Sequence, residues 1–135
     1  MSMDPRSDDE GVPMVTELTL DLKTILNELT RKTGIIAALV VSRDGFIIDG
    51  TSGEDVDLEA LAAVTSGAFV AWEAAGVEVA IGQPRVLLVE TESGAIVVTP
   101  VDADAMLVLM GNRLCNLGRL RIEAGRARDS VGRCL

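Results

Sequence analysis

Few residues in this chain could carry out chemistry. It has no histidine, which excludes a serine–histidine–aspartate triad, a histidine general base and a histidine metal site. Neither Cys115 nor Cys134 has a metal-type spacing or a neighbouring base. Asp44, Asp102 and Asp104 could form a carboxylate cluster, but each lies in a turn that favours aspartate for backbone reasons. The sequence also lacks the glycine motifs that bind nucleotide phosphates. We therefore expect no catalytic residue, metal or cofactor, and no enzyme activity.

Function must then come from binding, and the charge distribution limits the partners. The net charge of −9 argues against nucleic acid, and the three aromatic residues do not make a base-stacking platform. Residues 111–135 differ, because they hold six of the twelve basic residues and only two acids. Two interpretations stay open: a solvated helix face that partly compensates the helix dipole, or a docking surface for an acidic partner. On the second interpretation the docking residues are Arg119, Arg121, Arg126 and Arg128.

The stretch between Asp57 and Gly76 predicts a helix that is apolar on two faces, since residues three and four apart share a face. The first face carries mostly large side chains, which we expect to fill a sheet's core: Leu58, Leu61, Ala62, Phe69 and Trp72. The second, which we call the small-residue face, carries Ala60, Ala63, Val64, Gly67, Ala71 and Ala74. A mid-helix glycine costs about 1 kcal/mol relative to alanine. Gly67 therefore favours close approach by another backbone, either a second copy of the chain or another part of a monomer.

The other elements follow from apolar runs and turn residues. Helices are predicted at 16–32 and 116–130, and strands at Ile35–Val41, Phe46–Ile48, Arg85–Thr91, Ala95–Thr99 and Ala105–Met110. The first and last strands are apolar at every position and belong in the middle of the sheet. Because hairpin partners lie side by side, the strand order becomes 2-1-5-4-3, with helices on both faces. The fold class is therefore an α/β sandwich with a five-stranded antiparallel sheet.

This order leaves Arg85–Thr91 as an edge strand that is apolar and free of proline. Such an edge invites pairing with another chain, as does the small-residue face. We therefore expect a homodimer whose interface combines the small-residue face with Arg85, Leu87 and Val89.

The length of 135 residues favours one domain. We expect a disordered acidic arm at 1–15, the domain at 16–130 and a flexible tail at 131–135. No apolar run reaches the ~18 residues of a membrane span, and the N-terminus is too polar and acidic for a secretory signal. The expectation is a cytoplasmic protein with reduced cysteines and no membrane insertion.

Several segments, taken in order, resemble the roadblock (dynein light chain) family. They are LNELTRKTGIIAALVVSRDGFIID, DLEALAAVTSGAF, GAIVVTPVDADAMLVLM and NLGRLR. The resemblance implies a roadblock/profilin-like fold and a homodimer or heterodimer built on the long middle helix and an edge strand. It also implies a non-catalytic protein that regulates a small Ras-like GTPase or acts as an adaptor. The chain is similar to the single-domain bacterial and archaeal type, which includes a gliding-motility GTPase regulator.

The expected function is therefore a homodimeric platform that regulates a small Ras-like GTPase, and no catalytic arginine can be carried over from the family. The alternative is a small-ligand sensor of the profilin-like or PAS-like α/β type. A sensor needs a pocket of roughly 300 Å³ or more, here between the sheet and a helix.

Overall fold

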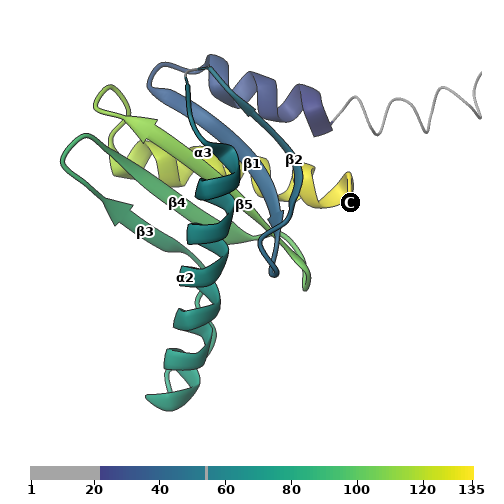
Figure 1. Ribbon diagram of the computed structural model, residues 1–135, viewed down its shortest axis with the longest axis vertical. Helices are drawn as coiled ribbons and strands as arrows, with labels where there is room; N and C mark the ends of the chain where they lie inside the picture. Colours follow the sequence, from purple (N-terminus) through teal and green to yellow (C-terminus); the bar gives the residue numbers. More distant parts are fainter. Residues whose placement is uncertain (1–21, 54) are drawn as a thin grey trace, which may run out of the picture.

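The computed structural model describes residues 22–53 and 55–135, so the predicted acidic arm lies outside the described residues. One antiparallel sheet forms the centre of the molecule (Figure 1). Its strands are β1 (Ile35–Ser42), β2 (Ile47–Ser52), β3 (Leu87–Glu90), β4 (Gly94–Pro100) and β5 (Ala105–Asn112). They lie in the order β2-β1-β5-β4-β3, which confirms the predicted order.

The central strands β1 and β5 are apolar on both sides because both faces of the sheet are covered where they lie. They pair in register from Ala37 opposite Met110 to Ser42 opposite Ala105. Successive residues alternate between two separate cores, since side chains of a strand point to opposite faces. Leu39 belongs to one core and Val40 to the other, and both are fully buried.

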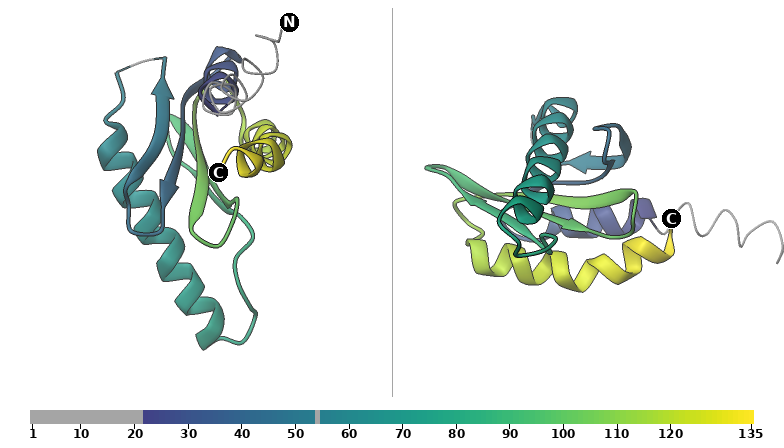
Figure 2. Two further views of the ribbon diagram at one scale, coloured as in Figure 1. Left: turned by 90° about the vertical axis from the view of Figure 1, so that its right-hand side faces the viewer. Right: turned by 90° about the horizontal axis from the view of Figure 1, so that it is seen from below.

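The helices are divided between the two faces, as predicted (Figure 2). The N-terminal helix, described over residues 22–31, and α3 (Leu117–Arg133) cover one face. On the other face lies α2 (Leu58–Glu78) alone, with Leu61, Ala62 and Phe69 buried against the sheet.

Local sequence signals fix where the helices begin and end. Asp57 caps α2, because its carboxylate accepts a hydrogen bond from the backbone N–H of Ala60 at 3.0 Å. Asn116 caps α3 in the same way. After the N-terminal helix the chain turns at Gly34, whose φ of +86° suits glycine. A Cβ there would lie 2.5 Å from the backbone nitrogen of Cys115, so two segments distant in sequence meet at this glycine.

Several predicted element ends were wrong. β2 continues through Asp49 and Gly50 to Ser52, because it pairs along β1 as far as Ala37 and an irregularity between Val40 and Val41 adjusts the register. Asp49 itself is held by an ion pair with Lys23 at 2.6 Å. The turn signal Asp-Gly therefore lies inside a strand, where tertiary pairing outweighs local preference.

The edge strand β3 is shorter than the predicted Arg85–Thr91, and Arg85 precedes it. Conversely, β5 extends past Gly111, and α3 extends past Ser130 to Arg133. Val131, which we assigned to the flexible tail, is fully buried in the core beneath α3.

Candidate functional site

The small-residue face of α2 is open in the protomer. All six of its residues are exposed, because α2 is buried along the opposite side of the helix. Around Gly67 a Cβ atom would meet nothing within 4 Å. The alternative that this face is buried within a monomer is therefore wrong.

The C-terminal half of α2 extends beyond the sheet (Figure 1). The helix contacts β1, β2 and β5, and Phe69 is its last large side chain buried on them. Beyond it, Trp72 is 55% exposed, so the expectation that Trp72 lies in the core was wrong. Further apolar side chains on this overhang and directly after it are also exposed: Val70 and Val77 in α2, and Val79 and Ile81 just beyond its end. The helical period correctly placed Trp72 on the side of α2 that faces the sheet. It gave no signal that the sheet ends before this residue.

One flank of α2 is fixed to the β1–β2 turn. A Cβ on Gly45 would lie 3.1 Å from Oγ of Ser66, so the turn packs closely on the helix. Arg43 donates a short charge-assisted hydrogen bond to the carboxylate of Glu73. This bond raises the pKa of the Arg43 guanidinium, although partial burial acts in the opposite direction.

The opposite flank of α2 faces a part of the sheet that no described helix covers. Ile96 of β4 and Met110 of β5 are only half-buried there, although they pack on the core beneath α2. An open cavity of about 470 Å³ lies between this flank and the sheet. Its lining is mostly apolar: Ile36, Asp55, Val56, Asp57, Ala60, Leu61, Val64 and Met110.

The strand β3 is the last in the sheet, as predicted for an edge. Leu87 is half-buried, whereas Arg85 and Val89 are exposed. Leu87 packs towards the core beneath α2 and Leu88 towards the core beneath α3, as the alternation of a strand requires. The backbone carbonyl of Arg85 accepts a hydrogen bond from Thr99 at 3.2 Å, which extends the β3–β4 pairing beyond the strand.

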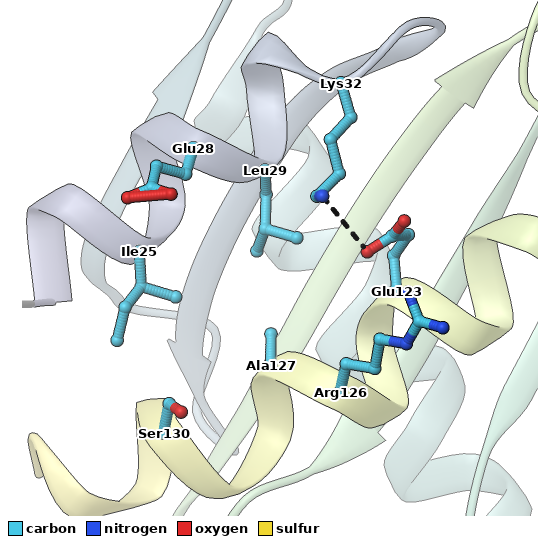
Figure 3. A pocket seen from close by; sticks show the side chains of 8 residues that line it. All are labelled: Ile25, Glu28, Leu29, Lys32, Glu123, Arg126, Ala127 and Ser130. Atoms are coloured by element: carbon cyan, nitrogen blue, oxygen red, sulfur yellow. Dashed lines mark ion pairs between the residues drawn. The ribbon is translucent and has the colours of Figure 1, made fainter.

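The arginines predicted as a docking surface lie along α3 in three different settings. Arg119 donates to the carbonyl of Thr33 at 2.8 Å and is tied to the protein. Arg126 lines a cavity of about 240 Å³ between α3 and the N-terminal helix (Figure 3). Arg128 lines a second cavity together with Arg85. Arg121 is simply exposed.

The groove around Arg126 already contains opposite charges. Lys32, directly after the N-terminal helix, and Glu123 of α3 form an ion pair at 3.6 Å across it (Figure 3). Glu28 adds a second carboxylate to the lining. The arginines therefore do not form one compact cationic patch, and part of the positive charge is balanced locally.

The other candidate groups have structural roles. Asp102 accepts hydrogen bonds from the backbone N–H groups of Asp104 and Ala105, both at 2.8 Å, and so closes its own turn. Burial raises the pKa of the Cys115 thiol, which disfavours its thiolate. Within residues 22–53 and 55–135, no group of three or more acids or cysteines could hold a metal ion.

By length and composition α2 could cross a membrane, the one helix in the described part of the chain of which this is true. A helix that packs on a sheet in a globular core meets the same criterion. In the structure, α2 uses its apolar surface against the sheet on one side and leaves it exposed on the other.

The fold and these surfaces define a class of protein: a small α/β module of the roadblock/profilin-like type, with a sheet edge and a helix face open to a partner. The chain belongs to the Roadblock/LC7 domain family, whose pattern matches residues 21–110.

Three comparisons illustrate the relationship. The uncharacterized protein MJ0310 of Methanocaldococcus jannaschii is 34% identical over 108 residues, which cover 79% of this chain and 93% of that protein. The structure of the gliding protein MglB from Thermus thermophilus superposes with a TM-score of 0.77 at 23% identity, over 84% of this chain and 87% of that one. Profilin II of Acanthamoeba castellanii gives a TM-score of 0.58 at 17% identity, over 83% and 98% of the two chains.

Proposed function

We propose that the protein is a cytoplasmic homodimer that binds and regulates a small Ras-like GTPase without chemistry of its own. The observation that supports this most is the pair of open surfaces on one protomer: the small-residue face of α2 and the free edge of β3. Membership of the Roadblock/LC7 family supports the regulatory role, and the fold is shared with MglB, a gliding protein.

The free edge of β3 favours antiparallel pairing with β3 of a second copy, and it does so in only some registers. If two copies of β3 pair antiparallel about a two-fold axis, opposite residues must point to the same face of the joined sheet. Leu87 and Leu88 point to different cores, so only registers that match their faces keep both cores continuous. With Leu88 on the axis, each Leu87 lies opposite Val89 of the partner subunit. This register retains two apolar pairs on the side of α2.

The proposed dimer should bury a standard-size interface of about 1,200–2,000 Å². The interface residues are those of the small-residue face, Ala60, Ala63, Val64, Gly67, Ala71 and Ala74, together with Arg85, Leu87 and Val89. Light scattering at micromolar concentration should report twice the protomer mass of 14.2 kDa. A monodisperse protomer at that concentration would contradict the proposal.

The dimer would act on a GTPase as a rigid platform. A ligand shifts the equilibrium between the GDP and GTP states only by its difference in affinity for the two. The test is capture of a Ras-like GTPase of the same organism, loaded in turn with GDP and with a non-hydrolysable GTP analogue. We expect at least a tenfold difference in dissociation constant, which is about 1.4 kcal/mol. If the affinity is equal for both states, the protein could still act as a scaffold for the GTPase. It could not regulate the GTPase by shifting the equilibrium between the GDP and GTP states.

The arginines of α3 are proposed to speed encounter with an acidic GTPase surface. Arg126 and Arg128 are exposed, and exposed charges act mainly on the association rate and are screened by salt. Replacing both with glutamate should slow association and flatten its salt dependence, with the dimer intact. Replacing the exposed Arg31 and Arg113 in the same way is the control with equal charge change. If both double variants slow association equally, only net charge matters and α3 is a solvated face.

A small-ligand sensor is the second candidate. It is favoured by the cavity of about 470 Å³ between α2 and the sheet, which exceeds the size that a sensor needs. The cavity is open and lies on the flank of α2 that faces the uncovered sheet. What fills it therefore decides between the two candidates.

A further inference from the structure

Trp72 is the single tryptophan of the chain, and it is more than half exposed on the overhang of α2. It lies on the flank opposite the β1–β2 turn, in line with Leu61, Val64 and Ala68, since these residues are spaced by three and four. Exposed tryptophan is costly in a free protomer and is enriched among residues that dominate protein interfaces. Its position thus points to a partner on this flank.

The cavity described above opens on the same flank, nearer the N-terminus of the helix. Leu61 and Val64 form its helical wall, and Ile36 and Met110 form the wall contributed by the sheet. Asp55 and Asp57 also line the cavity and bring carboxylate acceptors to it. An apolar cavity with acceptors in its lining suits an apolar ring that carries one N–H donor, which describes the indole group.

We propose that the partner's Trp72 fills this cavity in the homodimer, reciprocally in both subunits, with its indole N–H directed at the carboxylates of Asp55 and Asp57. This inference rests on the proposed homodimer and adds to it the residue that anchors the two helices. The helices then meet along the flank of Trp72, to which Val64 and Ala71 are the nearest members of the small-residue face, whereas Gly67 lies about 100° around the helix from Ala68. Trp72 and the cavity lie at opposite ends of the same flank, so each protomer carries both the anchor and its socket.

Two-fold symmetry supports this pairing. When two copies of α2 pack antiparallel along this flank about an axis near Ala68, the residue four positions after the axis lies opposite the residue four positions before it. Trp72 of one helix then faces Val64 of the other, which lines the cavity. Ala68 at the crossing is small enough for the close approach of 8–10 Å that packed helices require. The overhang of each α2 lies over the uncovered sheet of its partner.

Because Trp72 is the sole tryptophan, its fluorescence reports on this site without labelling. The emission maximum and the acrylamide quenching constant are measured across a dilution series, with the mass followed in parallel by light scattering. We expect blue-shifted emission and at least threefold weaker quenching in the dimer than in the protomer. A dimer whose Trp72 is quenched as strongly as in the protomer would overturn the inference while the proposed homodimer stands. A protomer at every concentration would instead refute the homodimer.

Two matched variants test where Trp72 contacts the second subunit. Val64 and Val77 are exposed to 67% and 68% in the same helix, but Val77 lies away from the cavity. Val64→Asp should weaken the dimer at least tenfold and shift the Trp72 emission to the red, whereas Val77→Asp should do neither. Equal effects of the two variants would overturn the insertion. The hydrophobic dye 8-anilinonaphthalene sulfonate should bind the protomer and be displaced on dimerisation; dye binding to the dimer, lost in Val64→Asp, would show a ligand cavity instead.

Discussion

Replacing Gly67 with tryptophan tests whether the small-residue face packs against a second helix. Nothing lies within 4 Å of a Cβ at this position in the protomer, so the larger side chain has room to extend into solvent. The helix itself should gain about 0.5 kcal/mol, because tryptophan has a better helix propensity than glycine. The free energy of unfolding of the protomer should therefore not fall.

The proposed dimer should respond in the opposite direction. Overpacking a close contact costs about 1–3 kcal/mol for each site, and a two-fold axis places the change in both subunits. The total of about 2–6 kcal/mol corresponds to a dissociation constant roughly 30- to 10⁴-fold higher. Gly125→Trp is the matched control, because Gly125 is also exposed in the middle of a helix with nothing within 4 Å of its Cβ.

The measurement combines sedimentation equilibrium for the dissociation constant with urea denaturation monitored by circular dichroism. We expect Gly67→Trp to be a folded protomer and Gly125→Trp a folded dimer. If Gly67→Trp keeps the wild-type dissociation constant, the small-residue face around Gly67 does not lie in the interface. The argument that a costly mid-helix glycine indicates close packing is then refuted, while a dimer whose helices meet along the flank of Trp72 stands.

Three further predictions concern the fold and the absence of chemistry. Gly34→Ala should lower the free energy of unfolding by at least about 2 kcal/mol, because it combines a positive φ with a Cβ 2.5 Å from the backbone. Gly125→Ala, the control, should be neutral or stabilising. Equal denaturation midpoints of the two variants would contradict this. At pH 8 iodoacetamide should modify the half-exposed Cys134 well before Cys115, because burial raises the pKa of Cys115 and reduces its thiolate fraction. Mass spectrometry of the peptides gives the order of labelling, and faster labelling of Cys115 would contradict the prediction. The purified protein should neither bind nor hydrolyse GTP, since its sequence has no phosphate-binding glycine loop with its lysine; turnover that a point mutation abolishes would overturn the non-enzyme proposal.

The sequence was sufficient for the topology because its strongest signals are local and mutually consistent. Two uninterrupted apolar runs require cover on both faces, and this places β1 and β5 at the centre of the sheet. The predicted starts of α2 and α3 at Asp57 and Asn116 are the positions where these residues cap the helices, and capping depends on only a few residues. The Asp-Gly pair at 49–50 misled because partner strands, which local preference does not include, hold it in an extended conformation.

The candidate site was predictable in composition but not in extent. The helical period separated the two faces of α2 correctly, because it depends only on spacing. It could not show where the sheet ends beneath the helix, and so it placed Trp72 in the core. The cavity beside Leu61 and Val64 also escaped prediction, since it forms between α2 and strands that are distant in sequence. Similarly, the ion pair between Lys32 and Glu123 makes the local charge along α3 different from the value that counting residues suggests.

If the protein forms the proposed homodimer, the overhang of α2 also bears on how long a protomer survives before it assembles. Val77, Val79 and Ile81 are each more than 60% exposed at an end of the helix that the sheet does not support. Helix ends with few tertiary contacts open more readily than the rest of a protein, and opened apolar segments are what cellular proteases and chaperones recognise. We therefore expect newly made, unpaired chains to be degraded faster than assembled ones. Turnover would then adjust the supply of this protein to the amount that finds a partner.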